Sequence, residues 1–269
     1  DVVWASSDAW HAIAAQAVCR SRGVPLVVDL YDNYESFNLA RVPGVQAKFA
    51  RACRGAAALT VVSSTLEELV VERYGFAGPV AIVGNAVDTA SFFPRDKREA
   101  RASLGLPAGV RIVGTAGALA KSRGIEDLFG AFDLLSKRQE DLCLAVAGPR
   151  DSSVSWPAHE RILDLGVLPS SDIALFWNAL DAAVICNKDS DFGRYCYPQK
   201  FQEIVACGTP FVAADVGEMA RICREVRSLL YRSGSAESLA DRLQDVLSLS
   251  ALPSQLRAVD WHERATIVG

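Results

Sequence analysis

The sequence predicts an α/β protein made of two Rossmann-like units with parallel sheets. Short β-branched or apolar runs alternate with amphipathic helical patterns along nearly all of the 269 residues, as in strands joined by helices that cross over a sheet. The alternation is interrupted at the proline- and charge-rich stretch FFPRDKREARASLGLPAG, 92–109. Half of the residues are hydrophobic and 22% are charged, a composition that can supply two cores. Two domains joined by a linker are therefore expected.

The first domain is expected to span residues 1–95 and to be incomplete at its N-terminus. Strands are predicted near 2–5, 26–30, 58–62 and 80–83, with helices near 9–21, 46–57 and 65–74. The opening letters DVVWASS read as a strand already under way, and four strands are few for a Rossmann-like domain. The linker is predicted over 96–109, with one short helix near 97–104.

The second domain, 110–250, is expected to be a complete doubly wound domain. Its strands are predicted in RIVGTAGAL, LCLAVAG, RILDLG, AAVIC, PFVAAD and SLLY, each followed by a loop or a helical pattern. The segment 251–269 is predicted to be a helix that packs back on the first domain, and Pro253 separates it from the preceding helix.

The composition argues against several classes of protein. A net charge of −4 and a pI near 5.5 provide no basic excess for binding nucleic acid. Three histidines, which we interpret as structural (His11, His159 and His262), and seven scattered cysteines without a C-x-x-C pair offer no metal-site spacing. The cysteines are expected to be buried thiols in a reducing compartment, and no apolar run has transmembrane length.

The stretch VGTAGALAKSRGIEDLF combines glycines with basic residues after a predicted strand. The strand is expected to end at Gly114 and Gly117, and Lys121 and Arg123 lie in the following loop. A glycine turn lets the backbone approach an anion closely, and basic side chains neutralise phosphate charge. The pattern therefore suits a diphosphate, although an ordinary strand-to-helix turn with solvated basic residues is the alternative.

The stretch YPQKFQEIVACG begins a second predicted helix at the same edge of the sheet. Pro198 is suited to the first helical position, and the free N–H groups of a helix start attract anions. Lys200 and Glu203 are three residues apart and share one helical face, so they can meet the phosphates and sugar hydroxyls of one ligand. The alternative is an intrahelical ion pair on a solvated face.

In order and spacing, the segments resemble the retaining nucleotide-sugar glycosyltransferases of GT-B fold, the group 1 or family 4 glycosyltransferases. The resemblance is carried by VVSSTLEELV, VGNAVDTASFFP, VGTAGALAKSRGIEDLFGAF, LCLAVAG, ILDLGVLPSSDIALFWNALDAAVI and YPQKFQEIVACGTPFVAADVGEM. It implies two domains facing a cleft, with a nucleoside diphosphate sugar bound mainly by the second domain and the acceptor by the first. It also implies that no metal ion or other cofactor is required.

The resemblance also implies roles for individual residues. Glu203 matches the final glutamate of the family's E-x7-E motif, which contacts the nucleotide ribose. The helix start at Pro198 and Lys200 would lie near the diphosphate or the donor sugar, and the loop from Gly114 to Gly117 beneath the phosphates. The segment ILDLGVLP would pass the nucleobase, so Val167 and Leu168 are candidates for that side of the site.

The sequence departs from the family pattern at several positions. The first E-x7-E position is Tyr195, and Asp189 or Asp191 could supply the acid from the longer loop. Ala118 replaces an arginine, for which Lys121 could compensate. Tyr31 stands where many members have a histidine, before Asp32.

Asp32, Asn33 and Glu35 are candidates for the acceptor side. A capping cluster at a helix or turn start is the equally supported alternative for Asp32 and Asn33.

These observations lead to one expected function. A hexosyl group would move from the nucleoside diphosphate sugar to an alcohol of a glycan, lipid-linked or small-molecule acceptor, with retention. Arg123, Lys121 and Lys200 would stabilise the leaving diphosphate, and Asp191 and Asp32 are the acidic candidates. The resemblance suggests polysaccharide biosynthesis in the cytoplasm, with peripheral contact at the inner membrane face. A GT-B sugar-nucleotide epimerase and a catalytically degraded nucleotide-sugar-binding protein remain open as alternatives.

Overall fold

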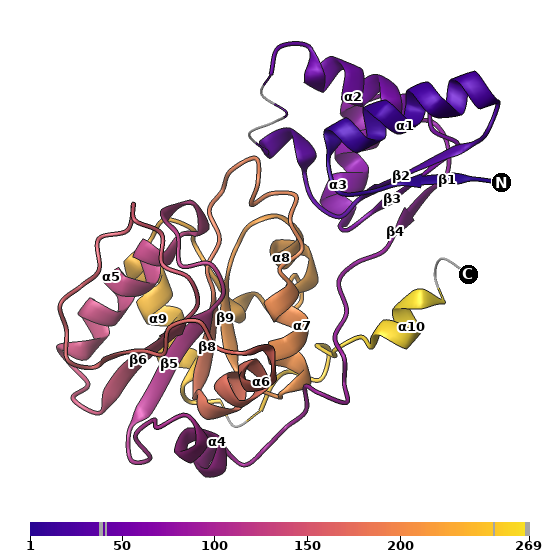
Figure 1. The fold of residues 1–269 in the computed structure, drawn as a ribbon. Coiled ribbons are helices and arrows are strands. Elements are labelled where there is room, and N and C mark those ends of the chain that lie inside the picture. Colours follow the sequence, from indigo (N-terminus) through magenta and orange to yellow (C-terminus); the bar gives the residue numbers. More distant parts are fainter. Residues whose placement is uncertain (38–39, 41, 250, 267–269) are drawn as a thin grey trace. The chain divides into compact units, whose positions relative to one another are not determined.

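The computed structural model describes residues 1–37, 40, 42–249 and 251–266, and the chain divides into two compact units (Figure 1). Unit 1 comprises Asp1–Asn85, Asp189–Tyr197 and His262–Gly269, and unit 2 comprises Ala86–Lys188 and Pro198–Trp261. The structure therefore differs from the predicted linker over 96–109, because these residues lie within unit 2 and the chain leaves unit 1 at 85–86.

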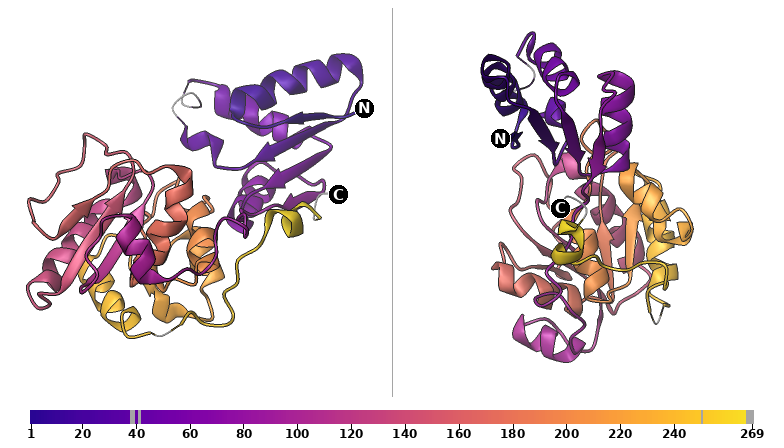
Figure 2. Two further views of the ribbon diagram at one scale, coloured as in Figure 1. Left: turned by 60° about the horizontal axis from the view of Figure 1, so that its bottom comes forward. Right: turned by 90° about the vertical axis from the view of Figure 1, so that its right-hand side faces the viewer.

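Unit 1 contains a four-stranded parallel sheet in the order β1-β2-β3-β4. The strands are β1 (Val3–Ala5), β2 (Leu26–Leu30), β3 (Ala58–Val61) and β4 (Val80–Ile82). Helices α1 (Ala9–Arg22), α2 (Val45–Arg54) and α3 (Ser64–Glu68) lie together on one face of this sheet (Figures 1 and 2). A π-helical turn, Leu69–Arg73, continues α3. The alternating side chains of β2 explain the one-sided core, since Leu26, Val28 and Leu30 are buried.

Local sequence signals fix the ends of α1. The side chain of Asp8 accepts hydrogen bonds from the N–H groups of Trp10 and His11, at 2.8 and 3.0 Å, and so caps the first turn. Gly23 ends the helix with φ of 65°, and its N–H donates to the carbonyl of Cys19.

Unit 2 contains a six-stranded parallel sheet in the order β10-β9-β8-β5-β6-β7. The strands are β5 (Arg111–Ala116), β6 (Leu142–Ala147), β7 (Ile162–Asp164), β8 (Ala182–Ile185), β9 (Phe211–Ala214) and β10 (Leu230–Tyr231). Numbered from β5, this is the Rossmann order 3-2-1-4-5-6, whose direction reverses between β5 and β8. All six strands lie in the segments where the sequence predicts them.

Helices cover both faces of the sheet in unit 2. They are α5 (Ile125–Ser136) and α9 (Ala236–Val246) on one face, and α6 (Ser170–Ala179) and α7 (Gln199–Ala206) on the other (Figure 1). The short helix α8 (Gly217–Ile222) follows β9. Because both faces are covered, the strands read as continuous apolar runs, and every residue of β6, β8 and β9 is buried.

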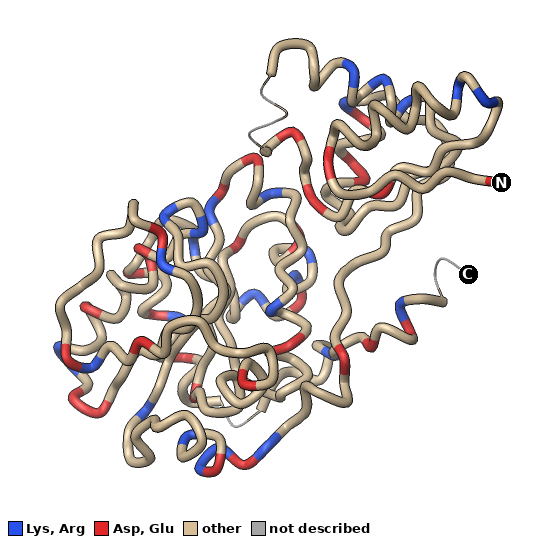
Figure 3. The backbone as a smooth tube through the Cα atoms, in the orientation of Figure 1, with Lys and Arg blue, Asp and Glu red and all other residues tan. Residues whose placement is uncertain are grey.

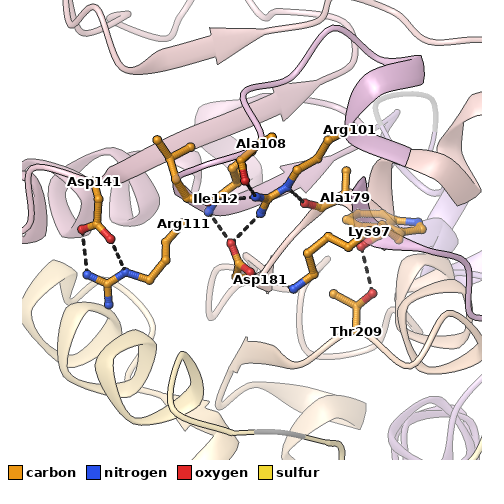
Figure 4. Close-up of polar contacts among 11 residues, drawn as sticks. Lys97, Arg101, Ala108, Arg111, Ile112, Asp141, Ala179, Asp181 and Thr209 are labelled. Atoms are coloured by element: carbon orange, nitrogen blue, oxygen red, sulfur yellow. Dashed lines mark hydrogen bonds and ion pairs between the residues drawn. The ribbon is translucent and has the colours of Figure 1, made fainter. Parts of the chain in front are cut away.

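Helix α4 (Lys97–Ser103) is held in unit 2 by a polar cluster around Asp181 (Figure 4). The carboxylate of Asp181 accepts hydrogen bonds from Lys97, from Arg101 and from the backbone N–H of Ile112, each at 2.7 Å. Arg101 is 4% exposed and also donates to the carbonyls of Ala179, Ala108 and Val110. This satisfied network explains why 96–109 is part of unit 2 rather than a free linker.

The C-terminal segment is less helical than the sequence predicts. Among the described residues after 250, helical backbone is confined to α10 (Trp261–Ala265), and 267–269 lie outside the described part. The preceding residues instead bind the first residues of unit 2 and helix α7. The N–H of Val87 donates to the carbonyl of Val259 at 2.9 Å, and Gln202 accepts from the N–H of Val259 at 2.8 Å.

Candidate functional site

The candidate site lies at the carboxyl edge of the unit 2 sheet, where β5 and β8 are neighbours and the strand order reverses. Doubly wound folds bind ligands at this position. Gly117 forms the turn after β5 with φ of 111°, and the Lys200 ammonium nitrogen lies 3.4 Å from the point that a Cβ on Gly117 would occupy. The glycine turn and the lysine, predicted from separate segments, therefore meet at one place.

Gly114 does not belong to this turn. The prediction that the strand ends at Gly114 is wrong, because β5 continues to Ala116. A Cβ on Gly114 would come within 2.4 Å of the Ala145 carbonyl and 3.1 Å of Leu180. Gly114 therefore allows close packing of β5 in the core and does not lie in a phosphate-binding loop.

Two glycines that the sequence analysis did not select complete the edge. Gly148 follows β6 with φ of 133°, and a Cβ there would lie 2.0 Å from the Gly117 carbonyl. The N–H of Gly117 donates to Ala147, and the N–H of Gly148 donates to Gly166, which follows β7. The signal in the sequence was a glycine directly after each of two apolar strand segments.

Helix α5 begins close to the loop that follows the carboxyl end of β8. Gly124, with φ of 78°, precedes the helix, and a Cβ on it would lie 3.5 Å from Asn187 and Lys188. Lys121 and Arg123 are the first and last residues of a 3-10 turn, and both are exposed. Glu126 is the ion-pair partner of Lys121 at 3.3 Å and of Lys188 at 3.7 Å.

The site is thus basic with one internal carboxylate. Lys188, which directly follows the strand AAVIC and an asparagine, was not selected from the sequence.

Helix α7 starts one residue later than predicted. Pro198 is the N-cap with φ of −65°, and Gln199 is the first helical residue. No side chain caps this end, so the N–H groups of the first turn are directed toward the carboxyl edge. Lys200 lies in that turn, and the local charge and the helix end both favour an anion.

Glu203 lies one turn further along α7 and is not on a solvated face. Its Oε2 accepts a hydrogen bond from the indole N–H of Trp177 in α6, at 2.9 Å. Burial raises the pKa of the Glu203 carboxyl, while the hydrogen bond from Trp177 and the charge of Lys200 act to lower it. The interpretation of Lys200 and Glu203 as a solvated surface pair therefore does not hold for Glu203.

The segment after β7 leaves one apolar side chain open to solvent. Val167 is 72% exposed, and Leu168 is half-buried. Asp164 forms an ion pair with Arg150 and accepts from the N–H of Gly166 at 2.8 Å. The guanidinium of Arg150 lies over the ring of Trp156, 4.1 Å from its centroid.

The acceptor-side candidates lie in unit 1, and Asn33 has a capping role there. The side chain of Asn33 accepts from the N–H of Glu35 at 3.2 Å at the start of the 3-10 turn Tyr34–Ser36, as the capping alternative predicts. Asp32 is half-buried and accepts from the N–H of Asn33 at 2.7 Å. Glu35 pairs with Arg73 at 2.9 Å, and only 8% of its side chain is exposed.

A polar cluster at the carboxyl edge of the unit 1 sheet was missed. Asp29 accepts from Ser6 at 2.8 Å and from Thr60 at 2.5 Å. Ser7 has φ of 95°, and its peptide groups are hydrogen-bonded to the hydroxyls of Tyr34 and Tyr31. The signal was a single aspartate inside an otherwise apolar strand.

Asp191 and Tyr195 also belong to unit 1, through the segment Asp189–Tyr197. The carbonyl of Asp191 accepts from the side-chain amide of Asn33 at 2.9 Å, and the carbonyl of Tyr195 accepts from Ser63 at 2.7 Å. The carboxylate of Asp189 pairs with Arg194. The loop that should carry the first E-x7-E acid is therefore anchored to unit 1 by its backbone.

The described residues contain no group of three or more His, Cys, Asp or Glu side chains that could hold a metal ion. His11 is exposed beside Asp8, and His159 accepts from the N–H of Arg161. Basic and acidic residues are interspersed along the chain (Figure 3). In the part of the chain that the structure describes, no helix is both long and apolar enough to cross a bilayer.

Two Rossmann-like units, one with a glycine and lysine site at its switch point, define a GT-B fold. Solved structures agree on the fold. Sucrose-phosphate synthase from Thermosynechococcus elongatus matches 99% of this chain and 68% of its own, with a TM-score of 0.75 and 19% identity. Anabaena HepE in complex with UDP matches 99% of this chain and 73% of its own, with a TM-score of 0.76 and 16% identity.

The chain belongs to the group 1 glycosyltransferases, whose family model matches residues 110–248. The model of Glycosyltransferase Family 4 matches residues 1–91. A D-inositol 3-phosphate glycosyltransferase from Saccharomonospora viridis is 28% identical over 96% of this chain and 61% of its own length. The putative teichuronic acid biosynthesis glycosyltransferase TuaC of Bacillus subtilis is 25% identical over 86% of this chain and 57% of its own. The chain therefore spans about three fifths of these relatives.

Proposed function

We propose that the protein transfers a hexosyl group from a nucleoside diphosphate sugar to an alcohol acceptor, with retention of the anomeric configuration. The observation that carries this proposal is the Lys200 ammonium beside the Gly117 turn, at the switch point of the unit 2 sheet. A cation at this place compensates the charge that builds up on the diphosphate as its bond to the anomeric carbon breaks. The glycine turn and the uncapped start of α7 add backbone N–H groups on the same side.

The remaining roles follow the geometry of unit 2. Arg123, which is exposed, adds a cation near the start of α5. Lys121 and Lys188 both pair with Glu126. Glu203 is one turn along α7 from Lys200, where it can accept hydrogen bonds from ribose hydroxyls. Val167 and Leu168 form the nucleobase side. The set works without a metal ion, because cations and helix ends supply the positive field.

The similar proteins support a uridine diphosphate sugar as donor and a polyhydroxylated acceptor. HepE structures are described with UDP, with UDP-glucose, and with UDP and glucose. The curated relatives are named for inositol phosphate and for teichuronic acid. UDP-glucose is therefore the first donor to test, with glycan, lipid-linked and small-molecule acceptors. The proposed location is the cytoplasm, with peripheral contact at the inner membrane face for a lipid-linked acceptor.

The test is a calorimetric titration of UDP into the protein and into Lys200→Met. We expect about a tenfold or greater loss of UDP affinity in this variant, since one charge-assisted contact to phosphate is removed. The matched control is Lys137→Met, because Lys137, the C-cap of α5, is 66% exposed and pairs with Asp133. Equal UDP affinity in all three proteins would contradict the proposed donor site.

A second candidate, a nucleotide-sugar-binding protein without transfer activity, is favoured by Tyr195. Tyr195 occupies the first E-x7-E position, and its carbonyl is bound to Ser63 in unit 1. Mass spectrometry of products with UDP-glucose and an acceptor panel separates the possibilities. A glycosylated acceptor supports transfer, a changed sugar nucleotide without acceptor indicates an epimerase, and UDP binding without either product indicates a binding protein.

A further inference from the structure

Trp177 is fixed on several sides in the last turn of α6. It is 1% exposed, and its ring packs edge to face against Phe176 with 5.2 Å between centroids. Its backbone carbonyl accepts a hydrogen bond from the Thr209 hydroxyl at 2.8 Å. The indole therefore has little freedom to follow a moving partner, and the partner must adapt to it.

The one polar atom of the indole is directed at the carboxylate of Glu203. Nε1 donates to Oε2 at 2.9 Å, within the normal range for a strong hydrogen bond to a charged acceptor. An ionised carboxylate has about four acceptor positions, so the second oxygen, Oε1, keeps its capacity for ligand hydroxyls. A glutamate side chain otherwise has considerable rotamer freedom, which ligand binding would have to restrict.

We propose that Trp177 is a positioning residue for the donor, because its indole N–H holds the Glu203 carboxylate in the orientation that receives the ribose hydroxyls. The proposal rests on the proposed function, which assigns the ribose contact to Glu203. Trp177 itself touches no ligand atom in this scheme. Trp177 acts by fixing the orientation of the Glu203 carboxylate, which accepts the hydrogen bonds, before the nucleotide binds.

The charges around Glu203 predict a measurable signature. Burial raises the pKa of its carboxyl, and the Trp177 hydrogen bond and the Lys200 charge oppose this. Cys207 is the C-cap of α7. Burial and the Glu203 charge raise the pKa of its thiol, and the Arg95 charge acts to lower it. α6 contributes the indole N–H. Removing the indole N–H therefore raises the pKa of the Glu203 carboxyl further.

The experiment measures UDP affinity between pH 5 and 8 for the protein, Trp177→Phe, Phe176→Leu and Glu203→Gln. Trp177→Phe keeps an aromatic ring and removes the donor, and we expect about tenfold weaker UDP binding at pH 7. As the pH is lowered, we also expect the UDP affinity of Trp177→Phe to fall at a higher pH than that of the parent protein. Phe176→Leu is the packing control, because Phe176 is buried and contacts the same ring. Protonation of UDP is common to all four proteins and cancels in the comparison.

The outcomes separate the positioning role from the proposed function. A pH midpoint in Trp177→Phe equal to that in Phe176→Leu, while Glu203→Gln weakens UDP binding, would overturn the role of Trp177 and leave the donor site intact. Unchanged UDP affinity in Glu203→Gln would instead refute the ribose assignment.

The carbon-13 shift of the Glu203 carboxyl gives a readout without nucleotide. If it titrates at the same pH in the parent protein and in Trp177→Phe, the positioning role is refuted even where UDP does not bind.

Discussion

Gly148→Ala tests whether the glycine turns after β5 and β6 are as closely packed as the structure shows. The Cβ of alanine would lie 2.0 Å from the Gly117 carbonyl oxygen and 2.8 Å from its carbon, and φ at this position is 133°. The clash can be relieved only by movement of the backbone, because the alanine Cβ would meet main-chain atoms of Gly117. Backbone strain costs about 1–3 kcal/mol and overpacking about 1–3 kcal/mol. The expected loss of unfolding free energy is therefore about 2–6 kcal/mol.

The assay is thermal and urea denaturation beside Gly105→Ala. Gly105 also has a positive φ, of 65°, but no atom lies within 4 Å of an added Cβ, so about 1–2 kcal/mol is expected there. The melting temperature of Gly148→Ala should fall by roughly 5–20 °C. UDP affinity should also fall below that of Gly105→Ala, since Gly117 lies beside Lys200. Equal stability of the two variants would refute the close approach of the turns.

Two further predictions concern the polar contacts that place loops and helices. Asp181→Asn should destabilise the protein by about 2–3 kcal/mol, because it leaves the buried Arg101 without its charge partner, whereas Lys97→Met should cost at most about 1 kcal/mol. Burial raises the pKa of the Asp181 carboxyl, but the contacts with Lys97, Ile112 and Arg101 bring it below its ordinary value. The contribution of Asp181 to the unfolding free energy is therefore present above the pKa of the unfolded state and is lost as the pH falls through the pKa of the folded state. Urea denaturation at several pH values should show a smaller loss of stability at low pH in Asp181→Asn than in the parent protein. Asn85→Ala removes the bond to the Tyr197 carbonyl at 2.7 Å, so trypsin should cleave after the exposed Arg194 about fivefold faster than in the control Ser21→Ala; equal cleavage rates would argue against anchoring of this loop in unit 1.

The strands of unit 2 could be predicted because burial on both faces of a parallel sheet leaves a continuous apolar run, as in β6, β8 and β9. In unit 1 the core lies on one face, and β2 alternates buried and half-buried residues. β2 was predicted over its observed range, Leu26–Leu30. α1 was predicted over 9–21 and spans Ala9–Arg22, with Asp8 and Gly23 as its caps. The extent of β5 was misjudged at Gly114. Gly114 is a glycine because a side chain there would clash with the Ala145 carbonyl in the core. The sequence does not distinguish such a glycine from one that is needed in a turn.

The candidate site was predictable where its residues follow strands in the sequence. Gly117 lies in the turn after β5 and Lys200 at the start of the helix that follows the neighbouring strand β8, so the rule for parallel sheets brings them together. Glu203 could be selected from its spacing, but its partner Trp177 could not, because the two lie 26 positions apart on different helices. Asp191 illustrates the converse, since its loop belongs to unit 1 despite following a strand of unit 2.

The sequence by itself determined the α/β class, the order of the elements and the family, because periodicity, caps and ordered motifs are local properties of the chain. Only the tertiary structure decided how long-range partners meet. It packs α4 on Asp181, brings the Gly148 turn against Gly117, and directs the Trp177 indole at Glu203. These contacts depend on the crossing of helices over the sheet and on three-dimensional packing, which leave no periodic trace in the sequence.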